Sequence, residues 1–396
     1  MKIIEQNKFS ESVISLRYVL ELNENTITSY NLLCHMLRAK TEAFEDKRKI
    51  SLELNKNYGM RMSINLSSYG KLLCLQYRFQ YIRSDWIDDD NYLDRIIDVM
   101  NQFLFHSVLT EENLLEAKYL LHNRLLMQRD DPFYMAMITS FGIIQEKQAL
   151  SIPVQGYLEK IDEVTLDDIE ELHTFIQSLH PHVYVCGHID EKVKNYLASI
   201  SSQNEILSNY SILKGCSYIE KRITRKIEQT CLSKVYKTNV EPSSKEYDAL
   251  LLMNSILGQS PVNLLFEEVR EKHSYCYSIG SNIVRFDGAL YIYAGCKKEN
   301  VDKILSLIDV QIQRLIDMEY EDDLLEIAKK DWMDGLTAGL DNQIAYIERS
   351  FISSILCQHR TLQQRMNAIQ QVTKEDISEV AKKLKAVSLA VVQEDE

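Results

Sequence analysis

The histidines are the first residues to test for metal chemistry, because imidazole is a common ligand of zinc. The chain of 396 residues contains nine. None has the spacing HxxxH, HExxH or HxxEH, which places two imidazoles on one face of a helix. His180 and His182 precede an expected strand and lack a nearby third ligand, which favours a surface loop pair. His35 lies in an expected helix, residues 28–41, whose apolar residues make a core histidine the simplest interpretation.

A second pair of residues has the chemistry of transition-state stabilisation. Arg270 and Tyr277 are seven residues apart. The sequence predicts that a helix ends near Lys272 and that a strand begins near Tyr275. An arginine fork and a phenol at such a turn could donate hydrogen bonds to a peptide carbonyl and its developing oxyanion. From spacing alone, a surface ion pair and a core tyrosine remain the alternative.

Composition excludes several classes of protein. Hydrophobic residues make up 45% and charged residues 26%, which is typical of a folded globular protein. The net charge of −13 disfavours nucleic acid or an anionic membrane as the main partner. The eight cysteines stand singly without CxxC, which indicates core residues rather than a disulfide framework or thiolate zinc site. No run of 18 apolar residues and no signal peptide is evident, so we expect a cytoplasmic protein.

A repeat with a period of about 210 residues organises the chain. In residues 160–186 and again in 370–392, a threonine followed by acidic residues begins an amphipathic helix, and a β-branched run follows. Two expected strands each follow a glycine, Gly70 and Gly288. The other matching pairs are residues 31–37 with 249–257, 71–79 with 289–295, 93–104 with 301–312, and 110–121 with 320–331.

This duplication predicts an α+β fold with two homologous lobes, each an antiparallel or mixed sheet packed with helices. Each lobe should begin with a strand and a helix, continue through a hairpin-like pair of strands and several helices, and close with a strand. We expect an N-terminal lobe at residues 1–205, a connecting segment at 206–228 and a C-terminal lobe at 229–396.

The order and spacing of these segments resemble the pitrilysin/insulinase family of inverzincin zinc peptidases, in its small two-lobe form. The strongest likeness lies in residues 251–281. Residues 186–197 are similar to the strand and helix that end the family's first lobe. The resemblance covers nearly the whole chain, and it implies that the two lobes form half of a clamshell.

The resemblance also implies that the metal motif is degenerate. The family binds zinc through HxxEH on the first helix, with the glutamate as base. The corresponding residues here are Asn31, Cys34 and His35, so only the second histidine remains. The family's third ligand, a glutamate, would fall near Glu111 or Glu112. We therefore expect no metal or other cofactor in this chain and no peptide hydrolysis by this chain alone.

Arg270 and Tyr277 match the family's Arg/Tyr pair, which contacts the substrate backbone and the oxyanion. The resemblance thus implies a zinc-less subunit of a heterodimer, whose homologous partner carries an intact HxxEH motif and the zinc. The chain is similar to subunits that process precursors of subtilosin-type bacteriocins. Two alternatives remain: an inactive scaffolding subunit, for example in translation-factor modification, and a structural subunit like the family's core proteins in respiratory complexes.

Overall fold

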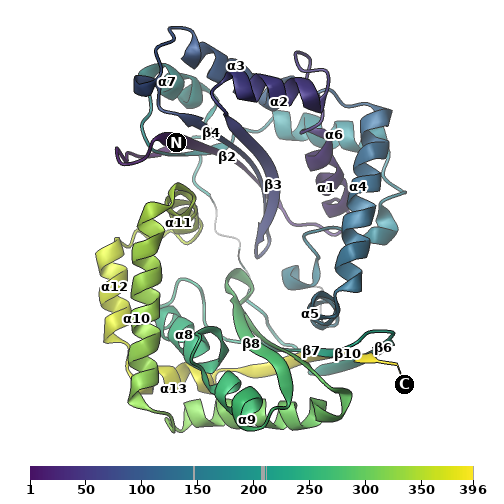
Figure 1. The fold of residues 1–396 in the computed structure, drawn as a ribbon, viewed down its shortest axis with the longest axis vertical. Coiled ribbons are helices and arrows are strands. Elements are labelled where there is room, and N and C mark those ends of the chain that lie inside the picture. The colour runs from purple at the N-terminus through teal and green to yellow at the C-terminus, as the bar shows by residue number, and fades with distance from the viewer. Residues whose placement is uncertain (146–147, 207–209, 211, 396) are drawn as a thin grey trace. The chain divides into compact units, whose positions relative to one another are not determined.

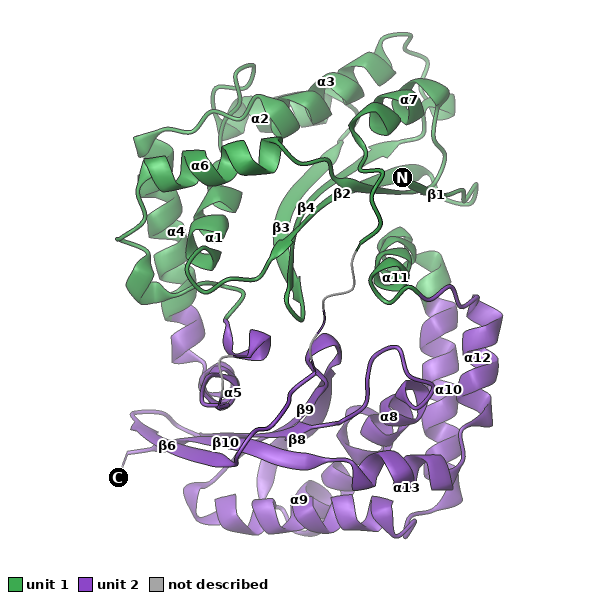
Figure 2. Cartoon of the chain, turned by 180° about the vertical axis from the view of Figure 1, so that it is seen from behind, with its two compact units in different colours: residues 1–126, 153–208, 339–357 green, residues 127–152, 209–338, 358–396 purple. Residues whose placement is uncertain are grey.

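The computed structural model describes residues 1–145, 148–206, 210 and 212–395. The chain forms two compact units, coloured separately in Figure 2. Unit 1 comprises residues 1–126, 153–208 and 339–357, and unit 2 comprises residues 127–152, 209–338 and 358–396. Each unit contains a five-stranded sheet packed with helices, which confirms the predicted α+β fold with two lobes (Figure 1).

The sheet of unit 1 has the order β1-β5-β2-β4-β3. Its strands are β1 (Lys2–Ile4), β2 (Glu11–Glu21), β3 (Arg61–Tyr69), β4 (Leu72–Ile82) and β5 (His182–Cys186). β1 pairs with β5 in parallel, and the other pairs are antiparallel, so the sheet is mixed. The β3–β4 hairpin turns at Gly70, whose φ of +63° explains the need for glycine there.

The sheet of unit 2 repeats this topology as β6-β10-β7-β9-β8. Its strands are β6 (Ile219–Arg225), β7 (Thr230–Lys237), β8 (Cys276–Val284), β9 (Ala289–Cys296) and β10 (Lys385–Glu394). β6 and β10 are again parallel and the rest antiparallel. β6 lies inside the segment 206–228 predicted as a connection, so this sheet begins before residue 229; residues 207–209 and 211 of that segment lie outside the described chain.

The helices of unit 1 are α1 (Ile27–Met36), α2 (Lys47–Lys56), α3 (Tyr92–Phe105), α4 (Glu111–Asp130), α6 (Leu166–Gln177), α7 (Glu191–Ile200) and α11 (Gln343–Ile355). Those of unit 2 are α5 (Pro132–Gly142), α8 (Tyr247–Asn254), α9 (Val301–Ile316), α10 (Asp322–Ala338), α12 (Leu362–Gln371) and α13 (Lys374–Lys382). Helices α3 and α9 lie where the apolar stripes at 93–104 and 301–312 predict them. Thr165 and Thr373 form capping boxes at the starts of α6 and α13, as their sequence contexts predict.

Each sheet is covered on one face by a helix from a segment distant in the sequence. In unit 1, α11 packs on β5, β2 and β1, and Glu348 accepts a hydrogen bond from buried Arg17 of β2 at 2.7 Å. In unit 2, α5 packs on β7 and β10, where the Ser140 backbone oxygen accepts a hydrogen bond from Ser388. Figure 2 shows α5 coloured with unit 2 and α11 with unit 1. A division of the chain near residue 205 would instead place α5 in the N-terminal lobe and α11 in the C-terminal lobe.

The opposite face of the unit 2 sheet carries the main apolar core, which combines strands β7, β9 and β10 with α8, α9 and α13. Seven of the eight cysteines are buried and reduced, as predicted for core residues, and Cys357 is exposed. Within the part of the chain that the structure describes, no helix combines the length and apolar character needed to cross a bilayer.

Candidate functional site

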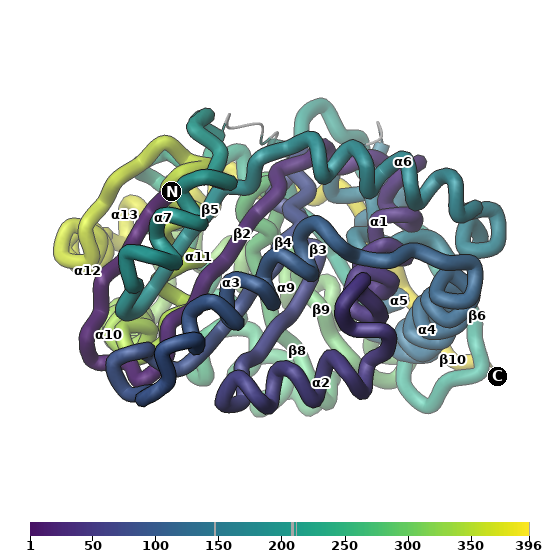
Figure 3. Tube along the Cα trace, turned by 90° about the horizontal axis from the view of Figure 1, so that it is seen from above, coloured from purple at the N-terminus to yellow at the C-terminus, as the bar shows by residue number. Residues whose placement is uncertain are grey.

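Helix α1 carries the residues predicted to form a degenerate metal motif. It lies beside α4 and α6 in both views of Figures 1 and 3, and nearly all of its residues are buried. Asn31 and His35 are four residues apart and therefore lie on the same face of the helix. The spacing that would orient two ligands together is thus preserved, although the first ligand is an amide.

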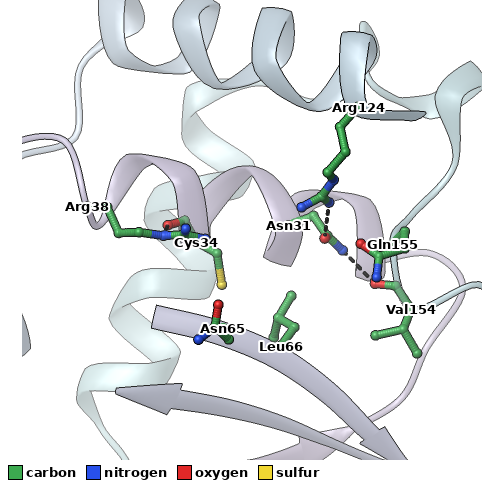
Figure 4. A pocket seen from close by; sticks show the side chains of 8 residues that line it. All are labelled: Asn31, Cys34, Arg38, Asn65, Leu66, Arg124, Val154 and Gln155. Atoms are coloured by element: carbon green, nitrogen blue, oxygen red, sulfur yellow. Dashed lines mark hydrogen bonds between the residues drawn. The ribbon is translucent and has the colours of Figure 1, made fainter. Parts of the chain in front are cut away.

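Asn31 is a structural hydrogen-bonding residue in this chain. Its side-chain NH₂ donates to the backbone oxygens of Ile27 at 2.9 Å and Val154 at 2.8 Å. Its Oδ1 accepts a hydrogen bond from Nη2 of Arg124 at 2.9 Å, as Figure 4 shows. Both donors and the carbonyl oxygen of the amide are therefore engaged, and the amide ties α1 to α4 and to the segment that contains Val154.

Cys34 is the residue that the resemblance aligns with the family's general base. It is 3% exposed, and burial raises the pKa of its thiol to about 12, against the opposing effect of Arg38 and Arg124. The thiol therefore stays protonated at neutral pH, whereas both metal ligation and base catalysis by cysteine require the thiolate. Cys34 thus cannot take over the role of a glutamate at this position.

His35 lies in a cationic environment. Burial, together with the charges of Arg38, Arg124 and Lys47, lowers its pKa to about 4, against an opposing effect from Glu116. Its Nε2 is buried and has no hydrogen-bond partner. The imidazole is neutral at pH 7, but the surrounding cations disfavour the approach of a metal cation.

The side chain of α4 that reaches the motif is a cation. Arg124 contacts Asn31, whereas Glu111 and Glu112 lie at the start of α4, about 18 Å along the helix axis at 1.5 Å per residue. The two glutamates suggested by sequence spacing are therefore not the residues of α4 that face Asn31. Within the described residues, no group of three His, Cys, Asp or Glu side chains has the geometry of a metal site. An amide, a protonated thiol and arginines do not fit the zinc that the resemblance implies for a member with the intact motif.

The predicted Arg/Tyr pair lies in unit 2. Arg270 belongs to a π-helical segment, Phe266–Lys272, and its guanidinium lies 4.7 Å from the ring centre of Phe266. Tyr277 is at the start of β8. Both residues line one surface pocket of about 590 Å³, together with Tyr275, Lys297 and Asn300 among others. The structure therefore brings this pair to a common solvent-accessible site.

A β-bulge gives Tyr277 its orientation. In the β8–β9 ladder Cys276 pairs with Cys296 and Ser278 pairs with Gly295, so Tyr277 is an extra residue without an opposite partner. Its side chain is 58% exposed, which contradicts the alternative of a core tyrosine. Bulges are frequent next to active sites because they redirect one side chain. Arg270, for its part, lies 4.0 Å from a carboxylate oxygen of its neighbour Glu271, so the surface ion pair of the alternative is present only at long range.

The turn before β8 is held by local contacts. Ser274 has a φ of +54°, an unfavourable value for a residue with a side chain. The rings of His273 and Tyr275 stack at 5.1 Å, and Asn300 donates a hydrogen bond to the backbone oxygen of Tyr275 at 3.2 Å. Tyr275, expected as a sheet residue, thus belongs to the turn instead. These contacts fix the geometry between Arg270 and Tyr277.

Comparison with known proteins shows which family this chain resembles. Residues 163–331 match the model of the peptidase M16 inactive domain. The probable inactive metalloprotease YmfF of Bacillus subtilis is 21% identical over 96% of this chain and 92% of its own length. This chain is similar to the M16, or pitrilysin, family of peptidases. The uncharacterized zinc protease YmxG of the same organism is another relative, 22% identical over 74% of this chain and 73% of its own.

Two solved structures share the fold of this chain. A conserved protein from Enterococcus faecalis V583 superposes with a TM-score of 0.90 at 22% identity, over 99% of this chain and 96% of that one. A peptidase M16 inactive domain from Pseudomonas fluorescens gives a TM-score of 0.82 at 14% identity, over 100% of this chain and 95% of that one. These likenesses confirm the two-lobe fold expected from the duplication.

Proposed function

We propose that this chain is the zinc-less subunit of a heterodimeric metallopeptidase. Its partner would be a homologous chain with an intact HxxEH motif, which would hold the zinc and the general base. This chain would contribute Arg270 and Tyr277 as donors to the substrate backbone and the oxyanion. The substrate would be a peptide precursor, with bacteriocin maturation as the favoured process.

One contrast between the two units supports this proposal. In unit 1 the motif positions hold an amide, a protonated thiol and a neutral histidine among cations. In unit 2 Arg270 and Tyr277 line an open pocket, and Tyr277 stands on a bulge with its phenol exposed. A chain that had lost every contribution to catalysis would have no need for this exposed and constrained pair. The name of the relative from Bacillus subtilis, a probable inactive metalloprotease, is consistent with the proposal.

The pair would act on the transition state rather than on the resting substrate. A phenolic O–H and a guanidinium N–H are preorganised donors, which stabilise negative charge that develops on the carbonyl oxygen. Loss of one such donor typically lowers the rate about 100-fold or more, with a smaller effect on substrate affinity. A role confined to assembly predicts no such selective loss of turnover.

The experiment is reconstitution with the intact-motif homologue from the same genome. Cleavage of the co-encoded precursor peptide is measured for this chain alone, for the homologue alone and for the mixture. We expect cleavage by the mixture only, with this chain metal-free by elemental analysis. Cleavage by this chain alone, or a mixture that neither assembles nor cleaves, would refute the heterodimer.

Variants then test the role of the pair. We expect Tyr277→Phe and Arg270→Ala each to lower turnover about 100-fold while the complex still forms on size-exclusion chromatography. Matched controls are Tyr218→Phe and Arg48→Ala, which change exposed residues outside the pocket. Unchanged turnover in the Tyr277→Phe and Arg270→Ala complexes would favour the scaffolding alternative, including a role in translation-factor modification.

A further inference from the structure

The pocket beside the degenerate motif has an unusual composition for an acidic protein. It has a volume of about 160 Å³ and is lined by Asn31, Cys34, Arg38, Asn65, Leu66, Arg124, Val154 and Gln155. These include two guanidinium groups and three side-chain amides, and none is acidic. They come from α1, the turn after it that carries Arg38, α4, β3 and the segment around Val154, and all eight lie in unit 1 (Figure 4). The pocket that holds zinc ligands in an intact motif is thus lined here by hydrogen-bond donors.

Arg38 is the charged donor whose environment matters most. Its Nε donates to the backbone oxygen of Cys34 at 2.9 Å, which fixes the guanidinium against α1. No carboxylate among the described residues forms an ion pair with it. By contrast, a carboxylate lies within 3.0 Å of the guanidinium of several other arginines, among them Arg17, Arg61, Arg83, Arg95, Arg222 and Arg360. Arg38 therefore presents its Nη groups without an internal counter-ion in the described structure.

The electrostatic field in this region favours an anion. The guanidinium groups of Arg38 and Arg124 line the pocket, and no acidic side chain does. Their positive field attracts a negative charge. A planar guanidinium matches a carboxylate in two parallel hydrogen bonds, and pocket amides can donate to the remaining lone pairs.

The pocket also borders a free sheet edge. Asn65 and Leu66 belong to β3, which is the last strand in the order β1-β5-β2-β4-β3 and, among the described strands, pairs with β4 alone. An edge strand of nine residues presents backbone donors and acceptors to which an extended peptide can add. At about 30 Å³ per water molecule, the pocket has room for a carboxylate and a few waters.

We propose that this pocket binds a carboxylate of a peptide that lies along β3, with Arg38 as the principal charged donor. The carboxylate would be either the peptide's C-terminus or an aspartate or glutamate side chain. The site of metal binding in an intact motif would thus have become an anion subsite. This inference rests on the proposed function only for the peptide nature of the ligand, and it requires neither a partner subunit nor catalysis.

The test measures binding to the whole chain without any partner. The probes are fluorescein-labelled decapeptides of alternating valine and serine, which have a C-terminal acid, a C-terminal amide, or an amide with one central glutamate or glutamine. Fluorescence anisotropy should show at least about 10-fold tighter binding of a carboxylate-bearing peptide than of its neutral counterpart. The two acidic probes distinguish a C-terminal carboxylate from a side-chain carboxylate.

The variants assign the preference to Arg38. Arg38→Gln should remove the roughly 10-fold discrimination, and Arg38→Lys, which keeps the charge without the fork, should retain only part of it. Arg48→Gln, an exposed arginine on α2, is the control and should keep the full preference. Circular dichroism melting confirms that each variant is folded.

Three results would overturn the proposal: equal binding of acidic and neutral peptides, an unchanged preference in Arg38→Gln, or no binding of any of the four peptides. Displacement of the acidic peptides by inorganic phosphate at concentrations near the peptide's Kd would assign the pocket to free phosphate instead. None of these results bears on cleavage by the reconstituted heterodimer, so the two proposals fail separately.

Discussion

The ion pair between Arg17 and Glu348 offers a direct test of how α11 is held on the sheet of unit 1. Arg17 is 1% exposed, and its Nη2 lies 2.7 Å from Oε2 of Glu348. The other carboxylate oxygen of Glu348 accepts a hydrogen bond from Tyr69 at 2.6 Å. The Arg17 guanidinium also lies 4.1 Å from the ring centre of Phe351. The perturbation we choose is Glu348→Ala, which removes the counter-charge and leaves the arginine in place.

The expected magnitude follows from the burial of the two partners. Truncation of one partner of a fully buried pair costs about 3–5 kcal/mol, because a charge is left uncompensated. The Glu348 side chain is 36% exposed, so water can reach the Arg17 guanidinium once the carboxylate is gone. We therefore expect a loss of about 2–3 kcal/mol in the stability of unit 1.

Hydrogen-exchange mass spectrometry of residues 343–355 is the assay, since local opening of α11 need not unfold unit 2. The control is Glu163→Ala, an exposed glutamate in unit 1, which should change stability by no more than about 0.5 kcal/mol. The double variant Arg17→Met with Glu348→Leu should recover most of the loss, because no buried charge remains. The reasoning is wrong if residues 343–355 exchange as slowly in Glu348→Ala as in the control. It is also wrong if the double variant is less stable than Glu348→Ala.

Three further predictions concern the motif and one buried acid. The triple variant Asn31→His, Cys34→Glu and Arg124→Glu supplies the missing imidazole and carboxylates and should bind about one equivalent of zinc by elemental analysis. Without the change at Arg124 the other two substitutions should leave the chain metal-free, because the guanidinium repels the cation. Burial raises the pKa of Asp287 to about 7, so its folded form keeps a proton that the unfolded carboxyl loses near pH 4. The stability that this proton contributes is lost as pH rises from about 4 through 7. Asp287→Asn should therefore be more stable than the parent by about 1–3 kcal/mol at pH 8, but not at pH 4. Equal differences in urea unfolding at both pH values would contradict this. His35, with its pKa lowered to about 4, should show no NMR titration between pH 8 and 5, and its contribution to stability should be lost as pH falls from about 6.5 through 4.

Much of the fold follows from local sequence patterns. The threonines of the two capping boxes and the glycines at the two hairpin turns were recognisable, because caps and positive-φ turns depend on a few adjacent residues. The amphipathic helices α3 and α9 were evident from their apolar stripes for the same reason. The exchange of α5 and α11 between units has no such local signature, since an apolar helix face does not specify which sheet it covers.

The candidate sites show the same limit. Asn31, Cys34 and His35 could be read as a degenerate motif, but the contact of Arg124 with Asn31 joins residues 93 apart and depends on how α4 packs. The bulge at Tyr277 depends on the pairing register of β8 with β9, which a single strand does not encode. The sequence does contain a sign of this contact, because Arg124 is a cation in the segment expected to supply the acidic ligand. It can be recognised only when it is known which face of α4 packs against α1.

Because α11 comes late in the chain, unit 1 cannot complete its folding until long after its sheet has been synthesised. Arg17 and Glu348 are 331 residues apart, and all five strands of the sheet are complete by Cys186. At roughly 5–20 residues per second, α11 follows β5 from the ribosome only after an interval on the order of ten to thirty seconds. During synthesis the face of the sheet that contains Arg17 is therefore not covered by α11, and the charge of this arginine lacks the counter-charge of Glu348. This is a long period of exposure for a nascent chain and the stage at which we expect a chaperone to be needed most.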